Sequence, residues 1–393
     1  MISREKSLGV LAICPQFRPI IGGYERAAER LSAALAGLGV HVVVITERRN
    51  RSWPRIEYVQ GYEIRRLFCS YRRHRHAITS LISFALYLVR HGGKFDVWHV
   101  HQYGLHAALA VVLGKLLRRP VILKLPSSGA MGIGKTVGVG VVGRAQRFLH
   151  LRVGACVVVS DETHNEAIRF GIPSERIHLI SNGVDGRRFC PALPEERAAT
   201  RRALGIACER LVLYVGRLSP EKNPIGLMDA WAAIDPSARA NTLLVIVGDG
   251  PEYDEVSAQS RKPNVAGSVH LAGHRSDVES WYRAADIYVI PSLLEGLSNT
   301  MIEALASGLP VVSTRVSGSA ILLAPLVSGV VVDVADVKQL ATAIETLLKD
   351  KPERDRLGEN ARVTFEEHFS IESSSKKMIS LYRDFVCPER RMA

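Results

Sequence analysis

Residues 8–46 read LGVLAICPQFRPIIGGYERAAERLSAALAGLGVHVVVIT. A short apolar run, LGVLAI, is followed by an amphipathic stretch, YERAAERLSAALAGLG, and then by a second apolar run, VHVVVIT. Apolar strands that are not interrupted by polar residues are typical of a parallel sheet covered by helices on both faces. This stretch therefore predicts a β-α-β unit.

The same alternation continues along the chain. Later apolar runs are FDVWHV, PVILKL and GACVVVS, and the pattern restarts at Leu211 with LVLYVG, TLLVIVG, GSVHLAG, ADIYVIP, LPVVST and GVVVDV. Strands that alternate with helices indicate an α/β fold. The sequence thus predicts two Rossmann-like, doubly wound parallel-sheet domains in tandem.

A segment rich in Gly, Pro and charge, NGVDGRRFCPALPEERAATRRALGI, separates the two patterns. We place the boundary near Pro191, so that residues 1–190 form the first domain and residues 191–370 the second. Ligands of open α/β sheets bind outside the carboxyl ends of the strands. We therefore expect function on strand-to-helix loops, around a central cleft between the two domains.

Positive charge is concentrated in the first half of the 393 residues. Through Asp185 the chain has 26 Lys and Arg residues against 12 Asp and Glu residues, whereas the remainder has 25 against 27. Such asymmetry indicates an anionic partner for the first domain: nucleic acid, a phospholipid surface or a phosphorylated acceptor. A generally basic proteome would explain the excess as well.

Two further features of composition bear on location. The six cysteines are scattered, without a C-x-x-C pair or a histidine at ligand spacing beside them, as expected of reduced thiols. No apolar run reaches the roughly 18 to 20 residues that a membrane span needs. We expect a cytoplasmic protein that is neither secreted nor integral to the membrane.

Two loops carry residues suited to phosphate. Gly22-Gly23 opens the first long helix, where the backbone can approach a ligand and free N–H groups face it. In YVGRLSPEKN, the cations Arg217 and Lys222 follow a strand that ends at Gly216, and Asn223 is placed to cap the next helix. Two cations at the carboxyl end of a strand suit a diphosphate, although solvated loop charges would look the same.

A third loop, in PSLLEGLSNTMIEALASGLPVVST, carries two acidic residues. Glu295 follows a strand, and Glu303 is predicted in the first turn of the next helix. The N–H groups of Leu297, Ser298 and Asn299 are candidates for phosphate contact, and Glu303 could hold a ribose diol. Thr300 and Glu303 also match a capping box, T-x-x-E, which is a structural alternative.

Taken together, these segments resemble the family-4-type (GT4) retaining glycosyltransferases of GT-B architecture. The resemblance extends over nearly the whole chain, through GGYERAAERLSAALAGLGVHVVVIT, DVWHVHQYG, RIHLISNGVD, GRLSPEKN, VGDGP, LAGHRSDV and EGLSNTMIEALASGLPVVST in order. It implies transfer of a hexosyl group from a UDP-, GDP- or ADP-sugar to an acceptor, with retention of anomeric configuration. It further implies an acceptor-side first domain, a donor-binding second domain and a final helix, about 370–390, that packs back on the first.

The resemblance also implies roles for single residues. Arg217 and Lys222 would neutralise the departing diphosphate, and Glu295 would act beside the transferred sugar. His274 and Arg275 would lie beside the nucleobase. Together with the loop residues named above, the predicted donor-binding set is Gly22, Gly23, Gly216, Gly248, His274, Arg275, Gly296, Leu297, Ser298, Asn299 and Glu303.

The chain departs from the family pattern at two positions. Pro126 stands where many members have a histidine near the reacting sugar, and Ile321 stands where G-G-x-x-E has its glutamate. The chain contains no D-x-D triplet, so we expect no metal and no cofactor, with Arg217 and Lys222 supplying the positive charge. The departures bear on donor preference and on activity.

Two other interpretations compete with this one. Gly129 to Thr136, GAMGIGKT, matches the pattern of a P-loop NTPase or kinase, but the residues that follow, VGVGVVGR, are poor helix formers. A non-catalytic basic protein that binds a membrane or nucleic acid would explain the charge. Such a protein has no need of Arg217, Lys222, Glu295 and Glu303, and no nucleic-acid-reading motif is present.

The basic first domain contains one more distinctive segment. Arg65, Arg66, Arg72, Arg73 and Arg75 precede an apolar stretch, residues 77–89, that is too short to span a bilayer. Cations beside an apolar segment favour binding at a lipid headgroup boundary. We expect a peripheral enzyme on the inner face of the cell membrane with a lipid-linked saccharide acceptor, unless the stretch is an ordinary buried helix.

Overall fold

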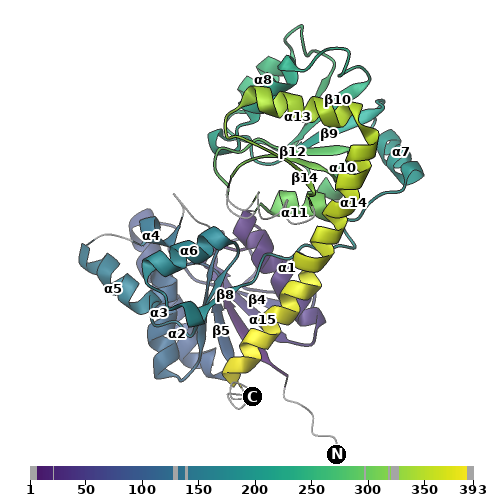
Figure 1. Cartoon of the computed structure of the whole chain (residues 1–393). Coiled ribbons are helices and arrows are strands. Elements are labelled where there is room, and N and C mark those ends of the chain that lie inside the picture. The colour runs from purple at the N-terminus through teal and green to yellow at the C-terminus, as the bar shows by residue number, and fades with distance from the viewer. Residues whose placement is uncertain are drawn as a thin grey trace, which may run out of the picture. The chain divides into compact units, whose positions relative to one another are not determined.

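The computed structural model describes residues 7–20, 22–126, 132–137, 140–295, 298–316, 319 and 327–386. The chain divides into two compact units, residues 1–183 with 371–393, and residues 184–370 (Figure 1). The sequence pattern places the boundary seven residues later, near Pro191. Both units have the predicted α/β architecture.

The first unit has a sheet of eight strands in its described part, in the order β3-β4-β2-β1-β5-β6-β7-β8. The pairs are parallel except β3 with β4. The strands are β1 Gly9–Ile13, β2 His41–Glu47, β3 Ile56–Val59, β4 Tyr62–Leu67, β5 Val97–Val100, β6 Val121–Leu125, β7 Ala155–Val158 and β8 Ile177–Leu179.

The antiparallel hairpin of β3 and β4 is a difference from the predicted all-parallel sheet. Its turn is Gln60-Gly61, and both residues have positive φ, 46° and 85°. Two consecutive residues with positive φ form a tight two-residue turn, and the twist of this turn matches the twist of the two strands that it joins. Parallel strands need a long crossover, so a two-residue connection requires the antiparallel pair.

Helices cover both faces of this sheet. One face packs α2 (Arg73–His91), α3 (Leu105–Leu116) and α6 (Asp161–Phe170) around Phe84, Trp98 and Phe170. The other packs α1 (Gly23–Gly37) and the last helix, α15 (Ile371–Val386), which contributes Met378, Leu381 and Tyr382 to the core. The short helix α4 (Ile133–Thr136) contacts α6, and α5 (Gly140–His150) contacts α3.

The second unit has a parallel sheet of six described strands in the order β11-β10-β9-β12-β13-β14. They are β9 Arg210–Val215, β10 Thr242–Val247, β11 Val269–Gly273, β12 Ile287–Ile290, β13 Val311–Thr314 and β14 Gly329–Val332. The α-helices in its described part are α7 Pro194–Ala203, α8 Pro224–Ala233, α9 Tyr253–Ser260, α10 Val278–Ala284, α11 Asn299–Ala306, α13 Val337–Lys349 and α14 Lys351–His368.

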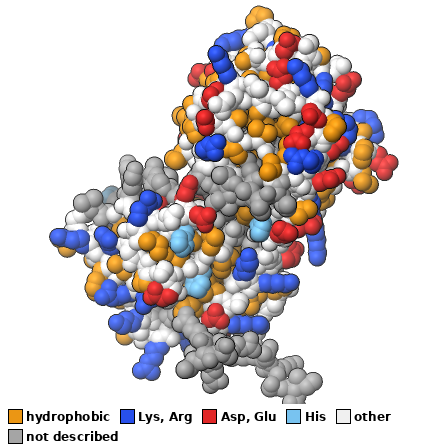
Figure 2. Space-filling model, in the orientation of Figure 1, with side chains coloured by type: hydrophobic (Ala, Val, Ile, Leu, Met, Phe, Trp, Pro, Cys, Tyr) orange, Lys and Arg blue, Asp and Glu red, His pale blue; other side chains and the backbone are white. Residues whose placement is uncertain are grey.

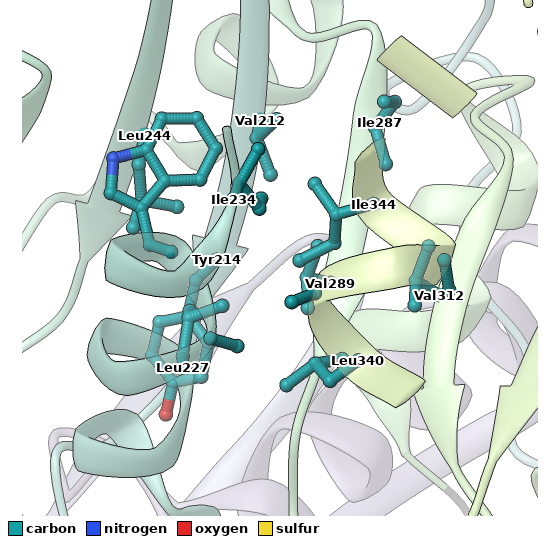
Figure 3. Close-up of a cluster of buried hydrophobic side chains, with 14 of the residues drawn as sticks. Val212, Tyr214, Leu227, Ile234, Leu244, Ile287, Val289, Val312, Leu340 and Ile344 are labelled. Atoms are coloured by element: carbon teal, nitrogen blue, oxygen red, sulfur yellow. The ribbon is translucent and has the colours of Figure 1, made fainter. Parts of the chain in front are cut away.

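One core cluster of this unit joins the sheet to α8 and α13. Val212, Tyr214 and Val289 of the strands meet Leu227 of α8 and Ile344 of α13 (Figure 3). These side chains are buried almost completely, and each contributes about 1.5–3 kcal/mol through the apolar surface it removes from water. The core holds the strand ends, and with them the loops, in fixed positions.

The predicted linker is partly helical. Its second half forms α7, which begins with Pro194 and has Glu195 and Glu196 in the first turn. Proline fits the first helical position, and acidic side chains favour a helix N-terminus. Gly and Pro in this segment therefore mark a helix start as well as a boundary.

Candidate active site

The order of the strands in the second unit reverses between β9 and β12. From β9 the chain proceeds to β10 and β11 on one side, and then to β12, β13 and β14 on the other. Such a reversal is where open α/β sheets bind ligands, because the loops on either side lead away in opposite directions. The predicted residues Arg217, Lys222 and Glu295 all follow these two strands.

Backbone hydrogen bonds join the two loops. The N–H groups of Leu293 and Leu294 donate to the carbonyl of Glu221, at 2.9 and 3.3 Å. The Asn223 side chain donates to the carbonyl of Pro291 at 3.2 Å and accepts from Gly226 N–H at 3.1 Å. The predicted cap of α8 by Asn223, with Pro224 first in the helix, is confirmed.

Lys222 and Glu295 form an ion pair across the joined loops. The Lys222 side chain is 27% exposed and that of Glu295 is 12% exposed, so the pair is accessible from solvent mainly on the lysine side. Ser292 also donates to Glu295, at 3.4 Å. Arg217 is exposed at the start of the same loop as Lys222. The structure thus places two cations, Arg217 and Lys222, on a loop that is joined to the loop of Glu295, although Arg217 and Glu295 are 78 residues apart in sequence.

The neighbouring Glu221 is held as an anion. A hydrogen bond from Ser219, at 2.6 Å, is the main cause that lowers the pKa of the Glu221 carboxyl, and the nearby Lys222 and Arg217 act in the same direction. This carboxylate offsets part of the positive charge of the loop. Arg217 and Lys222 consequently lie in a mixed environment, near the carboxylates of Glu221 and, for Lys222, Glu295.

The glycines of the adjacent loops allow close approach of backbone to backbone. A Cβ atom on Gly248 would overlap the carbonyl oxygen of Gly216, and one on Gly250 would overlap that of Leu218. Gly248 N–H donates to Gly273 at 2.8 Å. Only glycine fits at Gly248, because any side chain there would push the loops after β9 and β10 apart.

Helix α11 (Asn299–Ala306) begins two residues earlier than a capping box of Thr300 with Glu303 predicts. Its N-cap is Ser298, whose hydroxyl accepts from Met301 N–H at 3.4 Å. Glu303 is the fifth helical residue, so the predicted capping box of Thr300 with Glu303 is wrong, and Glu303 lies in the second turn. Ser298, and not Thr300, is the N-cap, because the Ser298 side chain accepts a hydrogen bond from a free N–H group of the first turn.

Glu303 is buried, with 2% of its surface exposed. Tyr282 of α10 donates to its Oε2 at 3.2 Å. Glu303 thus lies inside the unit, where Tyr282 holds its carboxylate and helix capping does not. Of the predicted loop residues, Ser298 and Asn299 lie at the start of α11, whereas Gly296 and Leu297 are outside the described residues.

His274 and Arg275 follow β11, two strands away from β9. At a spacing of about 4.8 Å per strand, β11 lies roughly 10 Å from β9 across the sheet. Both are exposed, and Arg275 pairs with Asp277 at 3.0 Å and lies over the Trp281 ring at 5.7 Å. The structure does not bring them into contact with Arg217 or Lys222.

In the first unit, Gly22 is the N-cap of α1 and Gly23 its first residue. The carboxylate of Glu25 lies against this turn, so that a Cβ atom on Gly22 would overlap it. Burial raises the pKa of Glu25. Sequence reasoning missed Glu25, although an acidic residue three positions after an N-cap glycine is a known sign of interaction with free N–H groups.

The P-loop interpretation fits the structure poorly. Residues 129–131 lie outside the described part, but Gly134, near the end of the motif, donates its N–H to the Glu166 carboxylate at 3.0 Å. A P-loop presents such N–H groups to a phosphate, and here an acidic side chain occupies that place. The helix that follows Gly132 has four residues only. The expectation that VGVGVVGR does not form a helix is wrong from Gly140 on, where α5 begins.

The sequence analysis also missed a buried polar group at the carboxyl ends of β5 and β6. Lys124 donates to Asn182 at 2.8 Å, and burial lowers its pKa to about 8. Burial lowers the pKa of His99 to about 3, and its Nδ1 lies 2.7 Å from the Tyr382 hydroxyl of α15. A lysine inside the apolar run VILKL was the available signal. Pro126, the first residue after β6, is half-buried.

Comparison with known proteins gives matches for both halves of the chain. Residues 21–188 match the family model "Glycosyltransferase Family 4", and residues 196–364 match "Glycosyl transferases group 1". The D-inositol 3-phosphate glycosyltransferase of Corynebacterium glutamicum (strain R) is 34% identical over 223 residues, which is 55% of this chain and 53% of that protein. The match therefore spans about half the length of that relative.

Two other similarities extend further. The Escherichia coli UDP-Gal:alpha-D-GlcNAc-diphosphoundecaprenol alpha-1,3-galactosyltransferase is 27% identical over 78% of this chain and 79% of its own. The crystal structure of Anabaena Alr3699/HepE in complex with UDP shares the fold, with a TM-score of 0.76 and 19% identity over 96% of this chain and 100% of that chain. The predicted family and fold are confirmed: the chain belongs to the family-4 type of glycosyltransferases with the GT-B fold.

Proposed function

We propose that this glycosyltransferase moves a hexosyl group from a nucleotide-sugar to an acceptor and retains the anomeric configuration. The observation that carries the proposal is the grouping of Arg217, Lys222 and Glu295 on two hydrogen-bonded loops where the strand order reverses. The structurally similar protein Alr3699/HepE was crystallised in complex with UDP, and the name of the Escherichia coli relative includes UDP-Gal. Both names support a nucleotide-sugar donor.

The chemistry explains why cations are needed. Cleavage of a glycosyl-phosphate bond develops negative charge on the departing diphosphate and positive character on the sugar. Fixed cations that contact the diphosphate stabilise this transition state more than the ground state, which accelerates the reaction. In our proposal Arg217 and Lys222 supply this charge without a divalent metal, and Glu295 faces the sugar.

The other donor contacts follow from the same placement. Glu303 would accept hydrogen bonds from the ribose hydroxyls, and the N–H groups at the start of α11, at Ser298 and Asn299, would contact phosphate together with Gly296 and Leu297. Gly216 and Gly248 allow a ligand to approach the loops closely. His274 and Arg275 would contact the base, and Gly22 and Gly23 the phosphates.

Titration of the full-length protein with UDP, GDP and ADP by calorimetry, with chelator present, tests the donor proposal. We expect one nucleotide to bind with a clear preference. The linkage of the product formed from the corresponding nucleotide-sugar is then read by NMR. Binding of none of the three would contradict the donor site, and an inverted linkage would contradict retention.

Glu303→Gln is expected to weaken binding of the nucleotide about tenfold while changing the free energy of unfolding by less than about 1 kcal/mol. Hydrogen bonds to a charged acceptor contribute about 1.5–3 kcal/mol and those to a neutral one about 0.5–1.5 kcal/mol, so the amide retains part of the interaction. Calorimetry with the preferred nucleotide measures the first quantity and urea unfolding the second.

Tyr282→Phe is the matched control for this prediction. It removes the internal hydrogen bond to Glu303 but keeps the carboxylate that would hold the ribose. We expect nucleotide affinity within about threefold of the unmodified protein. Normal affinity in Glu303→Gln combined with lower stability would show that Glu303 is structural only.

We further propose a lipid-linked saccharide acceptor and peripheral binding to an anionic membrane. No helix in the described part of the chain is long and apolar enough to cross a bilayer. Helix α2 buries Phe84 and Leu88, but it exposes a stripe of apolar side chains, Ile78, Ile82, Leu86 and Val89, which are 62%, 54%, 66% and 57% exposed. The stretch is thus neither a fully buried helix nor a spanning one.

Exposed apolar side chains also occur on α3, which contacts α2, and on α5, which contacts α3. Leu116 of α3 is 73% exposed, and Val141, Val142 and Phe148 of α5 are exposed as well. Exposed apolar side chains that adjoin one another on neighbouring helices mark an interaction surface. In Figure 2, Lys and Arg side chains border hydrophobic ones in this region.

Charge favours a lipid surface as the partner. Between Ile64 and Ser160 the chain has 15 Lys and Arg residues and one acidic residue, Asp96, which accepts a hydrogen bond from Gly9 N–H. Basic residues near an anionic leaflet each contribute about 1 kcal/mol. A surface with apolar side chains and almost no acidic ones suits an anionic headgroup layer.

The combined change of Arg72, Arg75 and Arg90 to Ser is expected to weaken binding to anionic vesicles roughly 100-fold, because three basic residues near the leaflet are lost. All three side chains are exposed on or beside α2. Co-sedimentation with vesicles of phosphatidylglycerol and phosphatidylcholine, at several salt concentrations, measures the effect.

Changing Arg202, Arg261 and Arg315 to Ser removes the same charge from the second unit, where these side chains are also exposed. This control is expected to bind vesicles like the unmodified protein. Equal binding to neutral and anionic vesicles, or equal loss in both triple variants, would favour a soluble acceptor instead.

A further inference from the structure

Four potential metal ligands from separate segments meet in the first unit. Glu47 is the last residue of β2, Cys69 follows β4, His76 lies in the first turn of α2 and His106 is the second residue of α3. Among the described residues, the ligand atoms of Glu47, Cys69 and His76 all lie within 4.8 Å of one another. They are at the carboxyl edge of the sheet, where open α/β sheets place their ligands.

The donor atoms are of a kind that binds zinc. A thiolate sulfur, an imidazole nitrogen and a carboxylate oxygen are the three protein ligand types of Zn²⁺, which also leaves a fourth position for water. With metal–ligand bonds of about 2.0–2.3 Å, tetrahedral ligands lie roughly 3.3–3.8 Å apart. His76 Nε2 and Glu47 Oε2 are already 3.4 Å apart, and the Cys69 sulfur is within 4.8 Å of the other ligand atoms, so it must approach by at most about 1.5 Å.

Neighbouring residues hold the Glu47 carboxylate in place. The Ser80 hydroxyl donates to Oε1 at 2.7 Å, and because it has one proton, it accepts from His106 Nε2 at 2.8 Å. Hydrogen bonds of this kind orient the ligands of a metal site. They engage Oε1 and His106, whereas Oε2 lies near His76 Nε2 and the Cys69 thiol donates to the Arg48 carbonyl at 3.5 Å.

One cation occupies this place in the structure. Arg49 pairs with Glu47 Oε2 through Nε and Nη2, both at 2.7 Å. The Arg49 side chain is 37% exposed and can turn into solvent, whereas Glu47 is 3% exposed and cannot. The buried Glu47 carboxylate needs a cationic partner, and a metal ion can take the place of Arg49 when the arginine turns into solvent.

We propose that Glu47, Cys69 and His76 form a binding site for Zn²⁺ that links α2 to the sheet. The dication balances the carboxylate and the thiolate, and binding releases the thiol proton of Cys69 to solvent. Only the thiolate form of a cysteine binds the ion, so Zn²⁺ displaces this proton when it binds. The site stabilises the first unit and takes no part in the transfer reaction.

Titration of chelator-treated full-length protein with Co²⁺ tests the proposal, because thiolate ligation produces a near-ultraviolet sulfur-to-cobalt charge-transfer band. We expect one equivalent to bind with this band, and Zn²⁺ to displace it. Cys69→Ser abolishes the band, whereas Cys156→Ser, a change of another buried cysteine, keeps it. Arg49→Gln removes the competing cation and is expected to tighten Co²⁺ binding.

His76→Gln provides a second test if Cys69→Ser does not fold, because His76 lies partly at the surface. It is expected to weaken Co²⁺ binding at least tenfold and to abolish the rise in melting temperature that Zn²⁺ produces in the unmodified protein. Absence of the charge-transfer band, or Co²⁺ binding that is unchanged in either variant, would overturn the site.

Discussion

Lys222→Ala is expected to lower the turnover of glycosyl transfer about 100-fold or more, with little change in the stability of the second unit. Removal of one group that stabilises developing negative charge costs about 2.7–4 kcal/mol of transition-state free energy. The ion pair of Lys222 with Glu295 is partly exposed, and such pairs contribute at most about 1 kcal/mol to folding. Release of nucleoside diphosphate from the preferred donor measures the rate, and Arg217→Ala is expected to behave alike.

Lys349→Ala is the matched control for this result. Lys349 also pairs with a glutamate of the second unit, Glu345, which lies four residues before it on α13. It is the last residue of this helix and does not belong to the loops that follow β9 and β12. Its loss removes the same charge and side-chain length, and kcat should stay unchanged. The proposed role of the cations would be wrong if Lys222→Ala and Arg217→Ala kept kcat within about threefold of the unmodified enzyme.

A mechanism in which Lys222 acts only through Glu295 makes a different prediction. In that case Glu295→Ala and Lys222→Ala would lower kcat equally, and the double variant would be no slower than either one. If both residues contact the reacting groups, the double variant is slower than each single variant. The comparison separates a positioning lysine from a catalytic one.

The second large effect is a loss of stability in acid; burial lowers the pKa of the neighbouring His101 as well, and the histidine tested here is His99. Burial lowers its pKa to about 3 in the folded protein, whereas an unfolded histidine titrates near 6.5. As the pH falls below 6.5, His99 therefore binds a proton in the unfolded chain but not in the folded chain. The free energy of unfolding decreases from there down to about pH 3, by up to about 5 kcal/mol, and is unaffected by this group above pH 6.5.

His99→Gln cannot take up this proton and should lose less stability in acid. The free energy of unfolding is measured with urea at pH 7 and at pH 4.5. Between these two pH values, the variant is expected to lose about 2–3 kcal/mol less than the unmodified protein. His74→Gln, a change of an exposed histidine on α2, should follow the unmodified protein. A parallel loss in His99→Gln and the unmodified protein would contradict this assignment.

Much of the fold could be predicted from local patterns. Continuous apolar runs identified the parallel strands, because strands covered on both faces have no polar positions to interrupt them. The repeat of this pattern after Leu211 predicted two units, and Gly-Gly, Arg217, Lys222 and Asn223 marked loops at strand ends. These features depend on neighbours within a few residues, which a sequence displays directly.

Other features depended on contacts between distant segments. The start of α11 at Ser298 instead of Thr300 was decided by which hydroxyl faces the first turn, and two residues so close together look equivalent in a sequence. The hairpin at Gln60-Gly61 and the exposed side of α2 likewise follow from what each element packs against. Local patterns predict an element, and tertiary packing decides its ends and its buried face.

The sequence by itself determined the fold class, the family and the loops that carry the candidate catalytic residues, since each is written in short contiguous motifs. Only the tertiary structure decided the pairing of Lys222 with Glu295, the burial of Lys124 and His99, and the meeting of Glu47 with Cys69 and His76. The physical reason is that ion pairs, pKa shifts and metal sites depend on distances of a few ångströms between side chains, and the order of strands in a sheet sets those distances.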